Sequence, residues 1–208
     1  MGIPREMKRA VFLDRDGVIN ASCGKDQFGK PDSPLNEKDL KIFPFVGKCI
    51  KTLNELGFLV FVVTNQPAVA KGKMSLDDLA QIHALIYHHI FKEGGNLKRI
   101  YTCLHHPDPC QVVFKEFLLK DCDCRKPKSG LIFQARDDYK IDLLNSWMIG
   151  DSWKDIEAGK KAGCQTIYIA SNDDVSVNAN FMAKNLEEAT RIIRYSVEMK
   201  GVRDVSTK

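Results

Sequence analysis

The chain has 208 residues, of which 44% are hydrophobic and 28% charged, a composition typical of an ordinary globular protein. Lys and Arg exceed Asp and Glu by 31 − 27 = 4, which suits an anionic small substrate but, without a long basic run, does not indicate a nucleic-acid partner. No stretch approaches the ~20 apolar residues of a membrane span, and the start lacks the apolar region of a signal peptide. We therefore expect a cytoplasmic protein with reduced thiols and no membrane partner.

The first predicted element is a short buried strand over residues 10–13, which ends at two aspartates. Asp14 and Asp16 follow this apolar run, and Gly17 then breaks it. Ligands of open α/β sheets bind outside the carboxyl ends of the strands. Side chains two positions apart in an extended chain point the same way, so these carboxylates should share a small volume. Their mutual repulsion favours a hard divalent cation between them, most simply Mg²⁺.

Helices and strands alternate along the rest of the chain. The predicted elements are, in order, a helix from Pro44 to Leu56, a strand over 58–63, a helix from a cap at Ser75 to Glu93, a strand over 97–103, a short helix capped by Ser129, a strand over 147–149, a helix over 156–162, a strand over 165–170 and a helix over 186–197. This alternation predicts an α/β fold with a doubly wound parallel sheet. We expect a single domain over 1–208, with its core at about 8–198 and a frayed tail over 199–208. The residues between Asn20 and Pro44 are too few for a large cap domain.

Two more strands are predicted to end in polar residues, at Thr64 and at Asp151. Because the carboxyl ends of parallel strands meet at one rim, we expect both residues to lie near Asp14. Phosphoryl transfer requires this kind of positioning and charge neutralisation. We therefore predict that Asp14 is a nucleophile that forms an aspartyl phosphate. Asp16 is predicted to protonate the leaving oxygen and later to take a proton from water.

The remaining parts of such a site can also be assigned. Asp14, Asp151 and the backbone carbonyl of Asp16 are predicted to hold Mg²⁺. Thr64 offers a hydroxyl group to the phosphoryl oxygens. Lys126, in the loop before Ser129, is the best candidate for the cation that such a reaction needs.

The seven cysteines include a cluster with metal-ligand spacing. Cys103 and His105 are followed by Cys122 and Cys124 in a C-x-H…C-x-C pattern. Three thiolates and one imidazole make a closed tetrahedral Zn²⁺ site of the structural kind. We predict a zinc loop over residues 103–124 that also fixes Arg125 and Lys126. His106 and Cys110 remain as alternative ligands.

Four segments, in order, resemble the motifs of haloacid-dehalogenase (HAD) superfamily phosphatases. They are residues 14–20, 64–66, 125–127 and 150–152, and the resemblance covers roughly residues 8–170. It implies the fold and the Mg²⁺-dependent chemistry expected above. Asp155 looks like the further acidic residue that this family places behind the metal or the lysine.

The cysteine cluster points to a particular group of phosphatases within this superfamily. It looks like the zinc loop of D-glycero-D-manno-heptose 1,7-bisphosphate phosphatases, whereas the related histidinol-phosphate phosphatases have a shorter loop. The resemblance implies removal of the 7-phosphate in ADP- or GDP-heptose biosynthesis, with histidinol phosphate as the alternative substrate. It also implies substrate contacts by Arg125, Asn65 and Gln66. We expect a monomer whose partner is a small phosphorylated sugar.

The sequence also departs from that family and leaves other functions open. Pro67-Ala68 replaces a usual Ser-Gly pair, which removes a backbone donor, and residues 21–34 are unlike the usual segment. A phospho-receiver domain shares the acceptor aspartate, threonine and lysine but needs neither Asp16 nor a zinc loop. A zinc-ribbon nucleic-acid binder is disfavoured because no interleaved aromatic and basic residues surround the cysteines.

Overall fold

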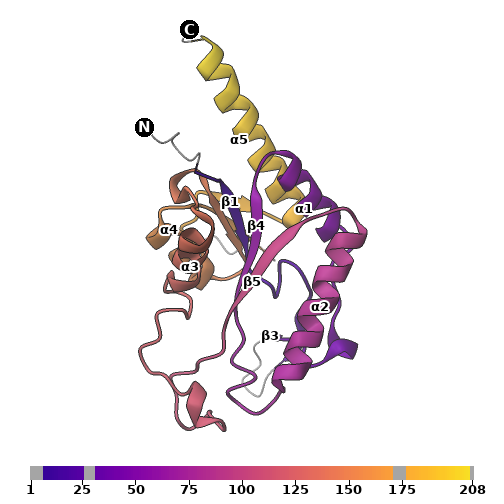
Figure 1. Ribbon diagram of the computed structural model, residues 1–208, viewed down its shortest axis with the longest axis vertical. Helices are drawn as coiled ribbons and strands as arrows, with labels where there is room; N and C mark the ends of the chain where they lie inside the picture. Colours follow the sequence, from indigo (N-terminus) through magenta and orange to yellow (C-terminus); the bar gives the residue numbers. More distant parts are fainter. Residues whose placement is uncertain (1–6, 26–30, 171–176, 207–208) are drawn as a thin grey trace.

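A six-stranded parallel sheet forms the centre of the molecule (Figure 1). The computed structural model describes residues 7–25, 31–170 and 177–206. The strands of this sheet, in spatial order, are β5 (Leu97–Cys103), β4 (Leu59–Asn65), β1 (Ala10–Leu13), β6 (Trp147–Gly150), β7 (Gln165–Ile169) and β8 (Phe181–Ala183). The chain therefore adds β4 and β5 on one side of β1 and then crosses back to add β6, β7 and β8 on the other side. Ligand sites in such sheets lie where this reversal occurs, at the carboxyl ends of β1 and its neighbours.

Helices cover both faces of the sheet. Alternate residues of β1 point to opposite faces, so Val11 and Leu13 enter one apolar core and Ala10 and Phe12 enter the other. The first core is completed by α1 (Val46–Glu55), α2 (Leu76–Lys92) and α5 (Leu186–Ser206), and the second by α3 (Gly130–Tyr139) and α4 (Trp153–Ala162). No helix in the described part of the chain is long and apolar enough to cross a membrane.

The predicted parallel α/β sheet is confirmed, and several short elements were missed. A two-stranded antiparallel sheet joins β2 (Cys23–Lys25) to β3 (Pro31–Asp32), and β8 adds an edge strand. Single-turn 3₁₀ helices lie at Glu37–Asp39, Lys115–Phe117 and Leu143–Asn145. These elements have two or three residues each, too few for a periodic pattern.

Three predicted element boundaries were wrong. The helix expected to open at Pro44 begins at Val46. The segment expected to be a frayed tail is helical as far as Ser206, because α5 continues through it. Ser129 stands at the cap position of α3 but does not cap it, since its hydroxyl donates to the Ala158 carbonyl of α4 instead, at 2.7 Å.

Candidate active site

The carboxyl ends of β1, β4 and β6 bring the predicted residues to one rim. Leu13 pairs with Val62 on one side and Ile149 on the other, so the residues that follow lie side by side. The Asp14 N–H continues this ladder by donating to the Ile149 carbonyl at 2.9 Å. Asp14, Thr64 and Asp151 are therefore neighbours because of sheet register.

Lys126 forms the centre of a buried polar cluster. Its side chain is only 4% exposed, and its Nζ lies 2.8 Å from Asp14 Oδ1 and 2.6 Å from Asp155 Oδ1. It also donates to the Val63 carbonyl at 2.7 Å, which uses the third ammonium proton. Burial opposes the charged ammonium, but the two carboxylates outweigh it and raise the pKa of Lys126. The lysine is thus a fixed cation that orients the Asp14 carboxylate.

Asp155 is held as firmly as the lysine it faces. It is fully buried, and its Oδ2 accepts from the Ser152 N–H at 3.0 Å and from the Ser152 hydroxyl at 2.7 Å. These bonds form a capping box at the start of α4. Gly150 makes room for this carboxylate, since a Cβ there would lie 2.1 Å from Asp155 Cβ.

Carboxylate oxygens of Asp14, Asp151 and Asp155 lie within 4.8 Å of one another. Burial, together with the charge of Asp155, raises the pKa of Asp14 to about 8 and that of Asp151 to about 7. Three hard oxygen donors that repel one another at this distance fit a divalent cation such as Mg²⁺. Asp155 lies in this cluster, but its oxygens already bind Lys126 and Ser152. It therefore lies behind the lysine, and Asp14 and Asp151 remain as the carboxylates that can hold the ion.

Gly17 allows Asp151 to reach this cluster. Its backbone has φ of +79°, and a Cβ at this position would lie 1.9 Å from Asp151 Oδ2. Any side chain here would displace the carboxylate, in a turn that L-residues already disfavour.

The Asp16 carboxylate points into its own set of donors. Oδ1 accepts from Arg15 Nη2 and from Asn20 Nδ2, each at 2.9 Å, and Oδ2 accepts from Gln66 Nε2 at 2.9 Å and from Ser33 Oγ at 2.8 Å. Burial alone would raise its pKa, but Arg15 and the amide hydrogen bonds lower it below the usual value. Asp16 is therefore ionised near neutral pH and ready to accept a proton.

Of the side chains that hold Asp16, the sequence singled out Gln66 alone. Arg15 and Asn20 are both fully buried. They lie in the 14–20 segment that carries the first motif, but neither of them was assigned a role from the sequence. Their position on either side of Asp16 in a predicted buried turn was the signal that could have identified them as its partners. Ser33 had no such signal, because it lies on a separate hairpin.

In the structure, Asn65 and Gln66 hold other residues of the site, and their predicted substrate contacts remain a prediction. Asn65 Oδ1 accepts from the Lys126 N–H at 3.1 Å, and its Nδ2 donates to the Lys126 carbonyl at 3.0 Å. Gln66 is fully buried, and its Nε2 donates to Thr64 Oγ1 as well as to Asp16, each at 2.9 Å. Asn65 thus holds the lysine, and Gln66 leaves the Thr64 hydroxyl proton free to donate to a phosphoryl oxygen.

The predicted zinc ligands form one cluster. Cys103 Sγ, His105 Nδ1, Cys122 Sγ and Cys124 Sγ all lie within 4.8 Å of one another, and the individual separations run from 2.9 to 3.9 Å. A tetrahedral Zn²⁺ site with three thiolates has S···S edges of about 3.8 Å. A hydrogen bond from Cys124 lowers the pKa of Cys103 to about 5, towards the thiolate that zinc requires. The donor set and its size therefore fit zinc.

The alternative zinc ligands lie outside this cluster. His106 Nδ1 accepts from the Asp108 N–H at 3.2 Å, while its backbone pairs with Phe117. Cys110 is exposed. The geometry thus places His105, and neither alternative, with the three cysteines. His105 also connects this cluster to the active site. Its carbonyl accepts a hydrogen bond from Arg125 Nη1 at 3.0 Å, and Arg125 directly precedes Lys126.

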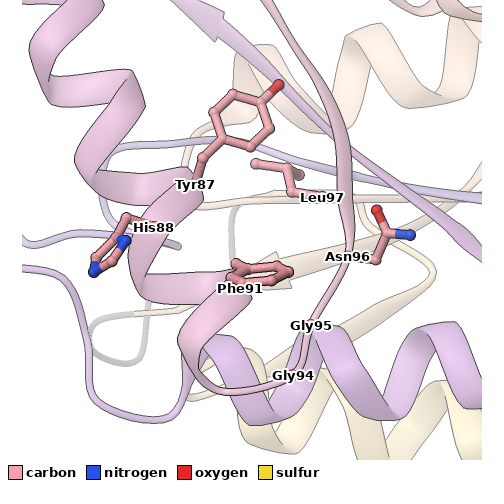
Figure 2. Close-up of a pocket in the computed structure, with 7 residues that line it drawn as sticks. All are labelled: Tyr87, His88, Phe91, Gly94, Gly95, Asn96 and Leu97. Carbon is pink, nitrogen blue, oxygen red and sulfur yellow. The ribbon is translucent and has the colours of Figure 1, made fainter.

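A separate cavity of about 580 Å³ lies at the opposite rim, between the end of α2 and the start of β5 (Figure 2). Tyr87 and Phe91 point from α2 towards the start of β5, whereas His88 points away (Figure 2). Tyr87 accepts a hydrogen bond from the Ile100 N–H at 3.0 Å, which protects the edge strand. The lining residues include no carboxylate or cysteine, so the chemistry lies at the other rim.

Known proteins share these features. A HAD-hydrolase-like family model matches residues 123–189. Over 196 residues the chain is 32% identical to the D-glycero-beta-D-manno-heptose-1,7-bisphosphate 7-phosphatase of Pasteurella multocida, a match that covers 90% of this chain and 98% of that protein. The chain belongs to the HAD superfamily of phosphatases. It is thus a hydrolase of phosphate esters.

Two further HAD phosphatases extend the comparison. The enzyme of the same name from Vibrio cholerae is 36% identical over 76% of this chain and 79% of its own length. The D,D-heptose 1,7-bisphosphate phosphatase of B. bronchiseptica, solved with magnesium and phosphate, superposes with a TM-score of 0.71 at 24% identity, covering 90% of this chain and 99% of that chain. The fold is therefore that of this superfamily.

Proposed function

We propose that this chain removes the 7-phosphate of D-glycero-D-manno-heptose 1,7-bisphosphate in a Mg²⁺-dependent reaction, on the path to a nucleotide-activated heptose. The observation that carries the proposal is the cluster of Asp14, Lys126, Asp151 and Asp155 at one rim, beside a Cys₃His loop. The names of the relatives that match most of the chain support the heptose substrate over histidinol phosphate.

The residues divide the reaction into two half-reactions. An Asp14 oxygen attacks phosphorus, and the bond to the leaving oxygen breaks. Asp16, which is ionised in the free protein, first binds a proton from solvent and then gives it to the leaving oxygen. Asp16 then takes a proton from water while the water oxygen attacks the aspartyl phosphate, which releases phosphate and regenerates Asp14. The Thr64 hydroxyl donates to a phosphoryl oxygen, and Lys126 holds Asp14 in place.

The metal and the loop have supporting roles. Asp14, Asp151 and the backbone carbonyl of Asp16 would hold Mg²⁺, with Asp155 behind them on Lys126. When bound, the ion neutralises the charge of the transferring phosphoryl group. Arg125, placed by its bond to the His105 carbonyl, recognises the sugar phosphate. The protein is one domain that acts as a monomer, and the reduced thiolates of the zinc site suit the cytoplasm.

A substrate panel with Mg²⁺ tests the proposal. We expect the highest kcat/KM on an anomer of heptose 1,7-bisphosphate, with fructose 1,6-bisphosphate and histidinol phosphate far slower. Phosphorus NMR of the product should show that the 1-phosphate remains. A preference for histidinol phosphate overturns the substrate, and turnover retained by Asp14→Asn overturns the nucleophile.

A further inference from the structure

Ser33 connects a hairpin to the proton-transfer group of the active site. It follows β3 directly, and its hydroxyl donates to Asp16 Oδ2 at 2.8 Å. Its N–H donates to Asp32 Oδ1 at 3.0 Å, and the other oxygen of Asp32 accepts from Lys73 Nζ at 3.1 Å. Pro34, the next residue, is buried. The serine backbone is thus held on both sides, so its contact with Asp16 is built into the fold.

The other partners of Asp16 present only N–H groups. The Arg15 guanidinium has no acceptor atom. Asn20 Nδ2 also donates to the Ala21 carbonyl at 2.9 Å, and Gln66 Nε2 also donates to Thr64. These second bonds resist the half-turn that would present an amide oxygen instead. All three partners therefore bind Asp16 only as hydrogen-bond donors.

The Ser33 hydroxyl differs because it can donate or accept by rotating one O–H bond. When Asp16 is ionised, the hydroxyl donates to it. Among the partners that the structure describes for Asp16, Ser33 alone contributes a hydroxyl group. Its hairpin is held by Asp32 and Lys73, so the contact fixes where Asp16 Oδ2 points.

We propose that Ser33 is a positioning residue that keeps the Asp16 carboxyl group aligned while it gives and takes the proton. The proposal rests on the phosphatase function proposed above. It does not depend on which sugar phosphate is the substrate, since every alkyl phosphate needs its leaving oxygen protonated. An aryl phosphate such as p-nitrophenyl phosphate does not, because p-nitrophenolate leaves without a proton.

The test compares kcat/KM on these two leaving groups, since kcat/KM reports the step that forms the aspartyl phosphate. For Ser33→Ala we expect about a tenfold loss on the best alkyl phosphate of the panel, a part of the 10²–10⁴-fold that a general acid supplies. On p-nitrophenyl phosphate the loss should stay below about threefold. Ser33→Thr, which keeps the hydroxyl, should recover most of the alkyl activity.

Ser33→Val is the matched control, because it has nearly the shape of threonine but no hydroxyl. It should behave like Ser33→Ala, and the Thr/Val pair decides the question if the alanine variant does not fold. Equal losses on both leaving groups, or equal activity of the Thr and Val variants, would overturn the role of Ser33. Failure of the heptose assignment would instead appear in the wild-type substrate ranking.

Discussion

Replacing the nucleophile should make the Mg²⁺-free protein more stable while abolishing turnover. Burial and neighbouring carboxylates raise the pKa of Asp14 to about 8, against the usual 3.8 of an aspartate. The folded state therefore binds this proton more tightly than the unfolded state does. A group of this kind loses stability as the pH rises from about 4 to 8. Asp151, with its pKa raised to about 7, adds to the same trend.

The size of the effect follows from the width of this pH range. Each pH unit between the two pKa values is worth 1.36 kcal/mol. Because the unfolded state ionises Asp14 from about pH 4 while the folded state keeps its proton, this group costs roughly 4 kcal/mol of stability at pH 7. Asn has no proton to lose, and its oxygen can still accept from Lys126 Nζ. We expect Asp14→Asn to be roughly 2–4 kcal/mol more stable than wild type at pH 8, because the lost ion pair offsets part of the gain. Near pH 5 the two proteins should be similar.

Urea unfolding from pH 5 to 8.5 measures this difference. The buffers should be freed of Mg²⁺ by resin treatment and contain no chelator, so that zinc stays bound. Added Mg²⁺ should stabilise wild type strongly at pH 8 and the variant much less. Asp77→Asn, an exposed aspartate on α2, serves as the control and should follow the wild-type pH dependence. A variant less stable than wild type at pH 8, or a flat wild-type profile, would refute the reasoning.

Three further changes test the supports of the site. Cys124→Ser should remove zinc, from about one ion per chain by elemental analysis, and lower activity at least tenfold. Gly17→Ala should weaken Mg²⁺ binding by more than tenfold in a titration of activity, because its Cβ would meet Asp151 Oδ2 at 1.9 Å. Asn65→Ala should lower kcat roughly tenfold with little change in KM, because the catalytic lysine loses both backbone anchors.

The sequence predicted the sheet and the position of its reactive rim well. Continuous apolar runs such as residues 58–63 are typical of buried parallel strands, and Asp14, Thr64 and Asp151 mark the places where such runs end. Parallel register then forces them together. The zinc ligands were predictable for a similar reason, since their spacing alone brings four soft donors within reach.

What the sequence could not predict is which atom each polar side chain binds. Asn65 and Gln66 were expected to touch the substrate, yet their amides hold Lys126 and Asp16. Spacing places a residue near a site but does not say where a rotatable amide points. Ser33 was missed because its partner, Asp16, lies on a different element of the chain. The strand that precedes it, β3, has only two residues, too few to give a pattern in the sequence.

The order of the strands has a consequence for how the protein is made. The nucleophile follows the first strand, but β1 needs β4 on one side and β6 on the other, and β6 begins only at Trp147. A growing chain therefore cannot gather its acidic cluster until about three quarters of it has left the ribosome. All four zinc ligands emerge before that point, between residues 103 and 124. The zinc ligands are close in sequence, so binding zinc closes only a short loop. Zinc can therefore bind first and fix the loop that carries Arg125 and Lys126 before the Mg²⁺ site forms.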